Sequence, residues 1–141
     1  MKNWMSFTVG AMIALAPVSV MAETYLCEMG PASGHDTFLI PPQTYIEHDT
    51  KTGKVTVYDG LIDEVYSQPI AAEISYENDK RITYAWSVKQ LKVQTTEGNW
   101  DVMPNNRYNL TIMKANLSAR ESMKPLGYQN TFKGKGKCVL K

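Results

Sequence analysis

Few side chains in this sequence could carry out acid–base or metal chemistry. The only histidines are His35 and His48, and the densest group of potential metal ligands is Glu47, His48 and Asp49. We expect this segment to be a strand, in which neighbouring side chains point to opposite faces, so Glu47 and His48 cannot easily bind one ion. We therefore expect no metal site here and interpret the cluster as the solvated end of a hairpin.

The rest of the sequence contains no recognisable catalytic arrangement. It lacks G-x-S-x-G and H-E-x-x-H motifs, a glycine-rich phosphate loop and zinc-finger spacing. Asp63 and Glu64 form an acidic pair that we expect to be exposed. A hydrolase that uses two paired carboxylates is an alternative interpretation, and only the presence of carboxylates supports it. Because no nucleophile with a partner base can be identified, we expect a non-enzymatic protein without a cofactor.

Four aromatic or sulfur-containing residues are the candidates for contact with a ligand or partner. Tyr84 and Trp86 fall on the presumed inward face of a strand, where packing in the core is the ordinary role and an aromatic-lined cavity is the alternative. Trp100 and Met103 lie within 90–106, which we interpret as a long loop. They either cap one end of the fold or contact a ligand or partner.

The two cysteines, Cys27 and Cys138, lie near the two ends of the predicted mature chain. An even pair in an exported protein most simply forms a disulfide, which would tie the first strand to the last. A redox or metal role is the alternative, but neither a C-x-x-C motif nor a nearby histidine supports it. In the chain-entropy model, closing a loop of about 100 residues adds about 4–5 kcal/mol of stability.

Alternation of apolar and polar residues predicts strands along most of the chain. We expect strands at 24–29, 44–48, 54–58, 70–77, 82–88, 108–112, from 117 onward, and 130–140, with 60–66 forming either one short helical turn or a further strand. About eight short strands with regularly spaced turns predict an all-β fold: a small antiparallel meander barrel or a flattened sandwich. Such a barrel holds side chains or one small ligand.

The last predicted strand has two distinct faces. One face holds Phe132, Gly134, Gly136 and Cys138. The two glycines on this face indicate tight curvature or a close backbone approach. The other face carries three lysines: Lys133, Lys135 and Lys137.

Charge is distributed unevenly along the chain. Residues 23–79 carry 11 acidic side chains and two lysines, and 80–141 carry 12 basic side chains and three acidic ones. Acidic and basic strands that pair across a sheet explain this pattern, and a basic face for an anionic partner is the alternative. Because the mature chain has no net charge, composition gives no general preference for nucleic acid or membrane surfaces.

The first segment, 1–22, has the features of a secretory signal peptide. Lys2 provides the positive start, 7–20 is apolar and uncharged, and cleavage is expected after Ala22. The apolar run is shorter than the roughly 18–20 residues that a membrane-spanning helix needs. We therefore expect a single domain at 23–141, located in the periplasm or secreted, with no membrane span after cleavage.

Five segments carry a resemblance to a known group of proteins: 24–29, 46–49, 53–62, 81–86 and 124–138. Together they resemble small exported β-barrel proteins of unknown function from Gram-negative bacteria, which implies a fold and a location but no activity. Tyr25-Leu26-Cys27 together with Cys138 is also similar to periplasmic inhibitors of C-type lysozyme. The serine and lysine loop motif of those inhibitors is not recognisable here, so no site residue is carried over.

Two functional hypotheses follow from these patterns. The first is an exported, non-enzymatic barrel that binds a small apolar or envelope-derived ligand, based on the strand number, the aromatic inner face and Trp100. The second is a protein-binding module, such as a periplasmic lysozyme-type inhibitor, based on the charge asymmetry and Trp100.

Overall fold

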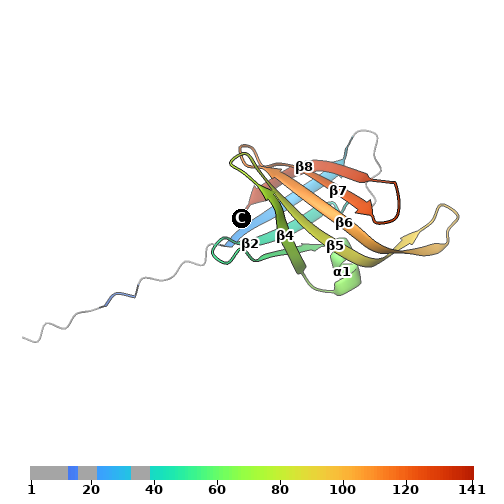
Figure 1. Cartoon of the computed structure of the whole chain (residues 1–141), viewed down its shortest axis with the longest axis horizontal. Coiled ribbons are helices and arrows are strands. Elements are labelled where there is room, and N and C mark those ends of the chain that lie inside the picture. The colour runs from blue at the N-terminus through green and yellow to red at the C-terminus, as the bar shows by residue number, and fades with distance from the viewer. Residues whose placement is uncertain (1–12, 16–21, 33–38) are drawn as a thin grey trace, which may run out of the picture.

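The computed structural model describes residues 13–15, 22–32 and 39–141 of the chain (Figure 1). The predicted signal peptide at 1–22 therefore lies almost wholly outside the described residues. The strands and the helix of the described part are β1 (Ala22–Pro31), β2 (Gln43–Asp49), β3 (Val55–Asp59), α1 (Gly60–Tyr66), β4 (Ile70–Glu77), β5 (Arg81–Gln94), β6 (Trp100–Met113), β7 (Ser118–Pro125) and β8 (Phe132–Leu140). No helix in this part of the chain is long and apolar enough to span a membrane.

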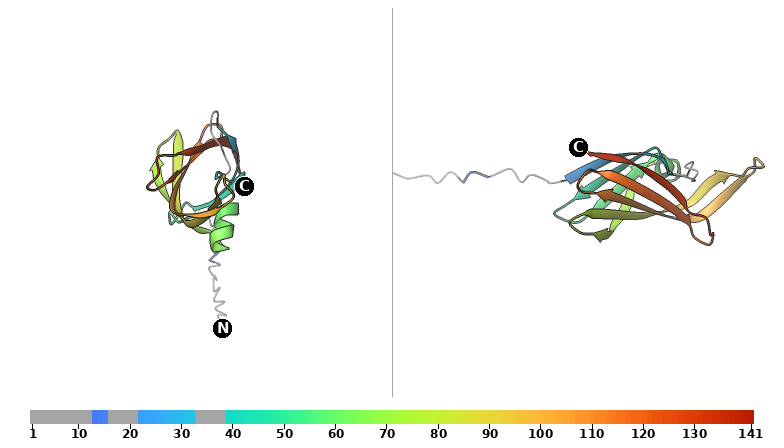
Figure 2. Two further views of the ribbon diagram at one scale, coloured as in Figure 1. Left: turned by 90° about the vertical axis from the view of Figure 1, so that its right-hand side faces the viewer. Right: turned by 90° about the horizontal axis from the view of Figure 1, so that it is seen from above.

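The strands form one closed antiparallel barrel, seen nearly end-on in the left view of Figure 2. Each strand pairs with the next along the chain, and β8 returns to pair with β1. Cys27 in β1 lies directly opposite Cys138 in β8, and a disulfide joins them. The predicted all-β meander barrel, closed by a terminal disulfide, is confirmed.

Apolar side chains that alternate along the strands fill the barrel interior. Tyr84 and Trp86 of β5 and Tyr108 of β6 are at most 2% exposed. The rings of Trp86 and Tyr108 stack with centroids 5.6 Å apart and planes 3° from parallel. Aromatic rings therefore occupy this part of the interior.

The glycines of β8 allow a close backbone approach, as the sequence predicted. A Cβ atom on Gly136 would lie 1.8 Å from the carbonyl oxygen of Glu28 in β1, and one on Gly134 would lie 2.9 Å from Cγ2 of Ile40. The barrel therefore closes at a position where no side chain fits.

The longest hairpin corrects a prediction from the sequence. Where a loop was expected over 90–106, β5 and β6 remain paired as far as Gln94 and Trp100. Figure 1 shows this hairpin, in yellow and orange, extending beyond the rest of the barrel. The predicted loop is wrong, and only a short turn at 95–99 connects the two strands.

A local irregularity explains why the sequence did not identify this extension. Gln90 and Pro104 are not paired in the ladder, because proline has no backbone N–H and Gln90 adopts a positive φ of 57°. The next buried residue of β5 after Val88 is Leu91, three residues further along instead of two. The strict two-residue alternation that identifies a strand is broken at this point.

Residues 60–66, for which the sequence left two interpretations open, form the helix α1. The helix begins after Asp59, whose carboxylate accepts a hydrogen bond from the N–H of Ile62 (2.8 Å). Ile62 is fully buried, and the hydroxyl of Tyr66 accepts a hydrogen bond from the N–H of Lys89 in β5 (2.9 Å). The helix is thus fixed to the barrel wall.

Candidate functional site

The four predicted contact residues do not come together in one site. Tyr84 and Trp86 lie inside the barrel, with 0% and 2% of their surface exposed. Trp100 and Met103 lie in the projecting part of β6, three residues apart, so their side chains leave opposite faces of the hairpin. Trp100 is 69% exposed, whereas Met103 packs partly buried against the core.

The outer face of the projecting hairpin combines apolar and basic side chains. Val102 shares this face with Trp100 and is 41% exposed. Lys92 lies directly opposite Val102, and Gln94 lies directly opposite Trp100. We call these four residues the hairpin face. Continuous strand pairing holds them on a defined surface at the far end of the molecule (Figure 2, right).

The opposite side of the hairpin is partly covered by the connection between β7 and β8. Leu126, in this connection, donates a backbone hydrogen bond to the carbonyl of Asn105 (2.9 Å). A hollow of about 180 Å³ between the two segments is lined mainly by Leu39, Val93, Met103, Pro125, Tyr128 and Phe132. The base of the hairpin is therefore supported, and its outer face stays open.

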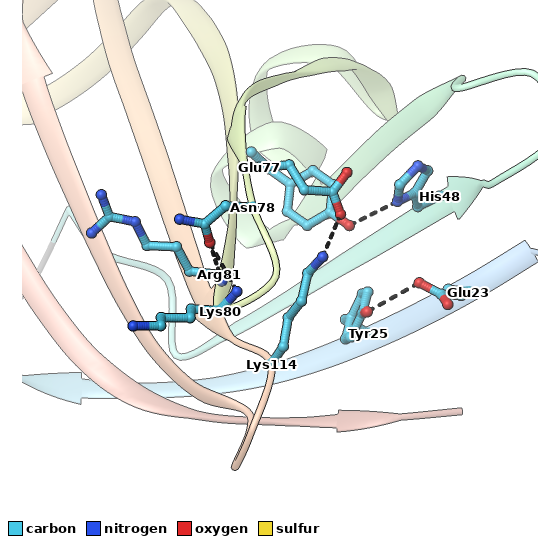
Figure 3. A network of polar contacts seen from close by, with 9 residues as sticks. Glu23, Tyr25, His48, Glu77, Asn78, Lys80, Arg81 and Lys114 are labelled. Atoms are coloured by element: carbon cyan, nitrogen blue, oxygen red, sulfur yellow. Dashed lines mark hydrogen bonds and ion pairs between the residues drawn. The ribbon is translucent and has the colours of Figure 1, made fainter.

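The other end of the barrel, where β1 begins and β8 ends, forms a polar mouth (Figure 3). His48 Nδ1 lies 2.9 Å from the Tyr84 hydroxyl oxygen. Tyr25 donates a hydrogen bond to Glu23 (3.1 Å), and Lys114 forms an ion pair with Glu77 (2.7 Å). The hollow at this mouth measures about 450 Å³, which lies within the range of small-molecule sites.

The position of His48 corrects a second prediction. The sequence placed it at a solvated hairpin end, but the residue is only 7% exposed. Thr44, Ile46 and His48 are the buried positions of β2, so continuing the alternation by one step identifies the inward orientation of His48. The side chain is held by Tyr84, whose ring meets the imidazole edge-on with centroids 5.7 Å apart.

Burial keeps both phenols at the mouth in their neutral form. Desolvation, followed by the hydrogen bond and charge of Glu23, raises the pKa of Tyr25 to about 12. Desolvation is also the main cause that raises the pKa of Tyr84, with smaller contributions from Tyr25 and Glu23. Neutral phenols supply hydrogen bonds without forming a nucleophile. The mouth is therefore suited to holding a polar group.

Two acidic side chains lie in the interior nearer the hairpin end. Asp59 caps α1, and burial raises its pKa to about 6 despite stabilising hydrogen bonds from the N–H groups of Ile62 and Leu61. Glu121 is 1% exposed, and burial together with the charge of Asp59 raises its pKa well above the ordinary value. Neither carboxyl oxygen of Glu121 has a hydrogen-bond partner among the described residues.

This acidic pair does not form an accessible catalytic site. Carboxyl groups with different pKa values can serve as acid and base in a cleft, but the burial of Glu121 keeps a substrate away from it. Within the described ranges, no group of three or more histidine, cysteine, aspartate or glutamate side chains could hold a metal ion. Asp63, of the predicted acidic pair, is exposed and accepts a hydrogen bond from Tyr58 (2.5 Å).

Comparison of the chain with protein-family models, with curated proteins and with solved structures gives no match. The functional proposal therefore depends on the geometry of the two barrel ends.

Proposed function

We propose that this protein is an exported, non-enzymatic binding module that docks to a protein partner through its hairpin face. The observation that carries the proposal is the 69% exposure of Trp100 on a hairpin whose strands stay paired from Leu91–Met103 to Gln94–Trp100. Tryptophan in water exposes a large apolar surface, and it is among the residues that most often dominate binding energy at protein interfaces. Its burial by a partner would be favourable.

The surroundings of Trp100 indicate the chemistry of the partner. Val102 extends the apolar surface, and the basic residue Lys92 lies directly opposite it in the strand register. A projecting hairpin of this kind fits a concave apolar pocket with a carboxylate at its rim. Because the backbone is already paired, docking would require little further ordering of the chain.

The location outside the cytoplasm is part of the same proposal. The Cys27–Cys138 disulfide fits an oxidising compartment, where such bonds persist. Periplasmic location or secretion would place the hairpin face in contact with envelope or extracellular proteins. The likeness to lysozyme inhibitors supplies one specific partner class to test.

A photo-crosslinking residue at position 100 tests the docking site directly. The matched control places the same residue at Tyr45, a 40% exposed aromatic on the outer face of β2. We expect a discrete crosslinked partner from position 100, absent from position 45 and competed by unlabelled wild-type protein but not by Trp100→Ala. Identical crosslinks from both positions, or none from position 100, would contradict the proposal.

Inhibition of a C-type lysozyme tests the specific version. Wild-type protein should slow hydrolysis of cell-wall substrate, Trp100→Ala should lose this effect, and Tyr45→Ala should retain it. If wild-type protein does not inhibit, the partner is not a lysozyme of this class, and the crosslinked species identifies it instead.

The polar mouth supports a second candidate function, the binding of a small envelope-derived ligand. Its hollow of about 450 Å³ combines apolar side chains, including Ile82 and Leu140, with the carboxylates of Glu23 and Glu77. An apolar ligand that carries a polar or cationic group would match this lining. Native mass spectrometry of gently purified protein should then reveal a bound small molecule.

Two neighbouring positions of β8 provide a matched pair for this test. Leu140 lines the hollow, whereas Val139 lies next to it on the opposite face, and the two are 52% and 51% exposed. Leu140→Trp should displace the co-purifying molecule, and Val139→Trp should retain it. Purification of wild-type protein without any bound molecule would leave the hairpin face as the better-supported site.

A further inference from the structure

We propose that the outer surface of β6, β7 and β8 is a binding groove for a linear anionic polysaccharide. Two adjoining hollows of about 820 and 360 Å³ lie on this surface, and both are bordered by Thr111, Arg120 and Lys135. They lie on the side of the barrel, so this site is separate from the hairpin face and from the mouth. The two hollows together are called the side groove below.

Among the described residues, no ion pair involves the basic side chains that line the side groove. The two ion pairs of the described chain, Arg107–Glu73 and Lys114–Glu77, use other residues. Arg120, Lys133 and Lys135 are all exposed. A bound anionic group would therefore not have to displace a carboxylate of the protein. It would also reduce the electrostatic repulsion between the neighbouring basic side chains.

Glu121 is the one acidic side chain among the described residues that line the groove. Glu121 borders the second hollow, but it is one of the buried positions of β7 and is 1% exposed. Arg81, at the edge of the first hollow, stacks over the ring of Tyr76 (4.8 Å from its centroid), which fixes its position. The described lining of the groove thus presents positive charge to solvent without an exposed carboxylate beside it.

The strand register sets the spacing of the cations. Lys133 and Lys135 lie on the same face two residues apart, about 7 Å along the strand. Arg120 lies directly opposite Lys135 in the neighbouring strand, at a spacing of about 5 Å. A regular array of this kind fits a ligand whose negative charges repeat along an extended chain.

The remaining lining residues distinguish a polysaccharide from other polyanions. Asn109, Thr111, Ser118 and Ser122 supply hydroxyl and amide groups, which hydrogen-bond well to sugar hydroxyls. None of the described residues that line the two hollows is aromatic, whereas single-stranded nucleic acids usually stack their bases on such rings. The lining therefore favours a sugar chain that carries carboxylate or sulfate groups.

The charge distribution of the whole chain supports the same orientation. Residues 23–79 are strongly acidic and 80–141 strongly basic, and the groove is built from the basic part. The resulting field would guide an anionic chain toward β6–β8 and away from the opposite wall. Charge pairing across the sheet does not account for the groove, because its lysines form no ion pair with described residues.

Calorimetric titration with two defined probes tests the proposal: heparin oligosaccharides, which carry sulfates, and polygalacturonate, which carries carboxylates. The groove variant combines Arg120→Glu with Lys135→Glu. The control variant combines Lys51→Glu with Lys54→Glu in the exposed β2–β3 turn, so the change in net charge is the same. Each variant is used only if its unfolding midpoint matches that of wild type. Where it does not, glutamine replaces glutamate at the same two positions in both the groove and the control variant.

We expect wild-type and control proteins to bind at least one probe alike, and the groove variant to bind it at least about tenfold more weakly. Asn109→Ala with Ser122→Ala keeps every charge and should weaken binding several-fold, because it removes hydrogen bonds to sugar. Equal losses in the groove and control variants, or no binding by wild type, would overturn the proposal. Preferential binding of single-stranded DNA or anionic vesicles over both probes would also overturn it.

Discussion

Cys27 and Cys138 face each other across the β1–β8 ladder, so the disulfide bridges the seam at which the barrel closes. Every other pair of neighbouring strands in the barrel is consecutive in the sequence. The seam brings together strands from opposite ends of the chain, so closing it costs more chain entropy than forming any of the hairpins.

Removal of this disulfide should therefore lower stability substantially. The cysteines are 111 residues apart, and the chain-entropy model gives about 4–5 kcal/mol for a loop of this length. We expect Cys27→Ser with Cys138→Ser, or reduction of wild-type protein, to lower the free energy of unfolding in urea by up to this amount. An unchanged unfolding midpoint after complete reduction would show that strand pairing alone holds the seam.

Substitution of Gly136 should be much more harmful than substitution of another glycine. A Cβ atom at Gly136 would lie 1.8 Å from the backbone oxygen of Glu28, so the two strands would have to separate. A Cβ atom at Gly60, in α1, would meet nothing within 4 Å. We expect Gly136→Ala to lower the free energy of unfolding by more than about 3 kcal/mol.

The control variant for this prediction is Gly60→Ala, which should leave stability unchanged or raise it by up to about 1 kcal/mol, since alanine favours a helix. Chemical denaturation of both variants provides the comparison. Similar stability of the two proteins would contradict the close approach of β8 to β1.

The two tryptophans of the described chain should respond in opposite ways to truncation. Trp86 is 2% exposed and stacks on Tyr108, so Trp86→Ala should lower the free energy of unfolding by about 3–5 kcal/mol. Trp100 is 69% exposed, so Trp100→Ala should change it by less than about 0.5 kcal/mol. Denaturant titrations monitored by circular dichroism measure both; a large loss in Trp100→Ala would assign Trp100 to the core.

Much of the fold could be predicted from the sequence because alternation is regular where a strand has one buried face. The inward positions Tyr84 and Trp86, and the exposed lysines of β8, follow directly from this pattern. The projecting hairpin could not be predicted, since the irregularity at Gln90 and Pro104 shifts the buried positions by one residue. The alternation of apolar and polar residues predicts which positions face inward only as long as the strand pairing has no irregularity.

The candidate site was less predictable for a related reason. The hydrogen bond between His48 and Tyr84 joins residues 36 positions apart, and the side groove joins three strands. Such groups are defined by the register between strands, which the alternation within a single strand does not reveal. Glu121 was overlooked because a charged residue on a strand is ordinarily exposed, although its neighbours Ala119 and Met123 are both buried.

The burial of Glu121 should make the stability of the barrel depend on pH. Burial raises the pKa of Glu121 well above its ordinary value and that of Asp59 to about 6. Above the ordinary pKa near 4, the folded chain therefore holds more protons than the unfolded chain. Stability should be greatest at mildly acid pH and fall as the pH rises through the raised pKa values.

Glu121→Gln removes one of these ionisable groups while nearly preserving the shape of the side chain. At about pH 4, near the ordinary carboxyl pKa, the folded and unfolded chains differ little in the protons bound at this position, so we expect the variant to be about as stable as wild type. At about pH 8 it should be more stable than wild type, because burial raises the pKa of Glu121 and glutamine has no charged form to bury. Glu28→Gln, at an exposed position of β1, should be about as stable as wild type at both pH values. Urea denaturation of the three proteins across this pH range decides the matter: if the Glu121→Gln curve runs parallel to that of wild type, Glu121 is not the buried group that destabilises the barrel at alkaline pH.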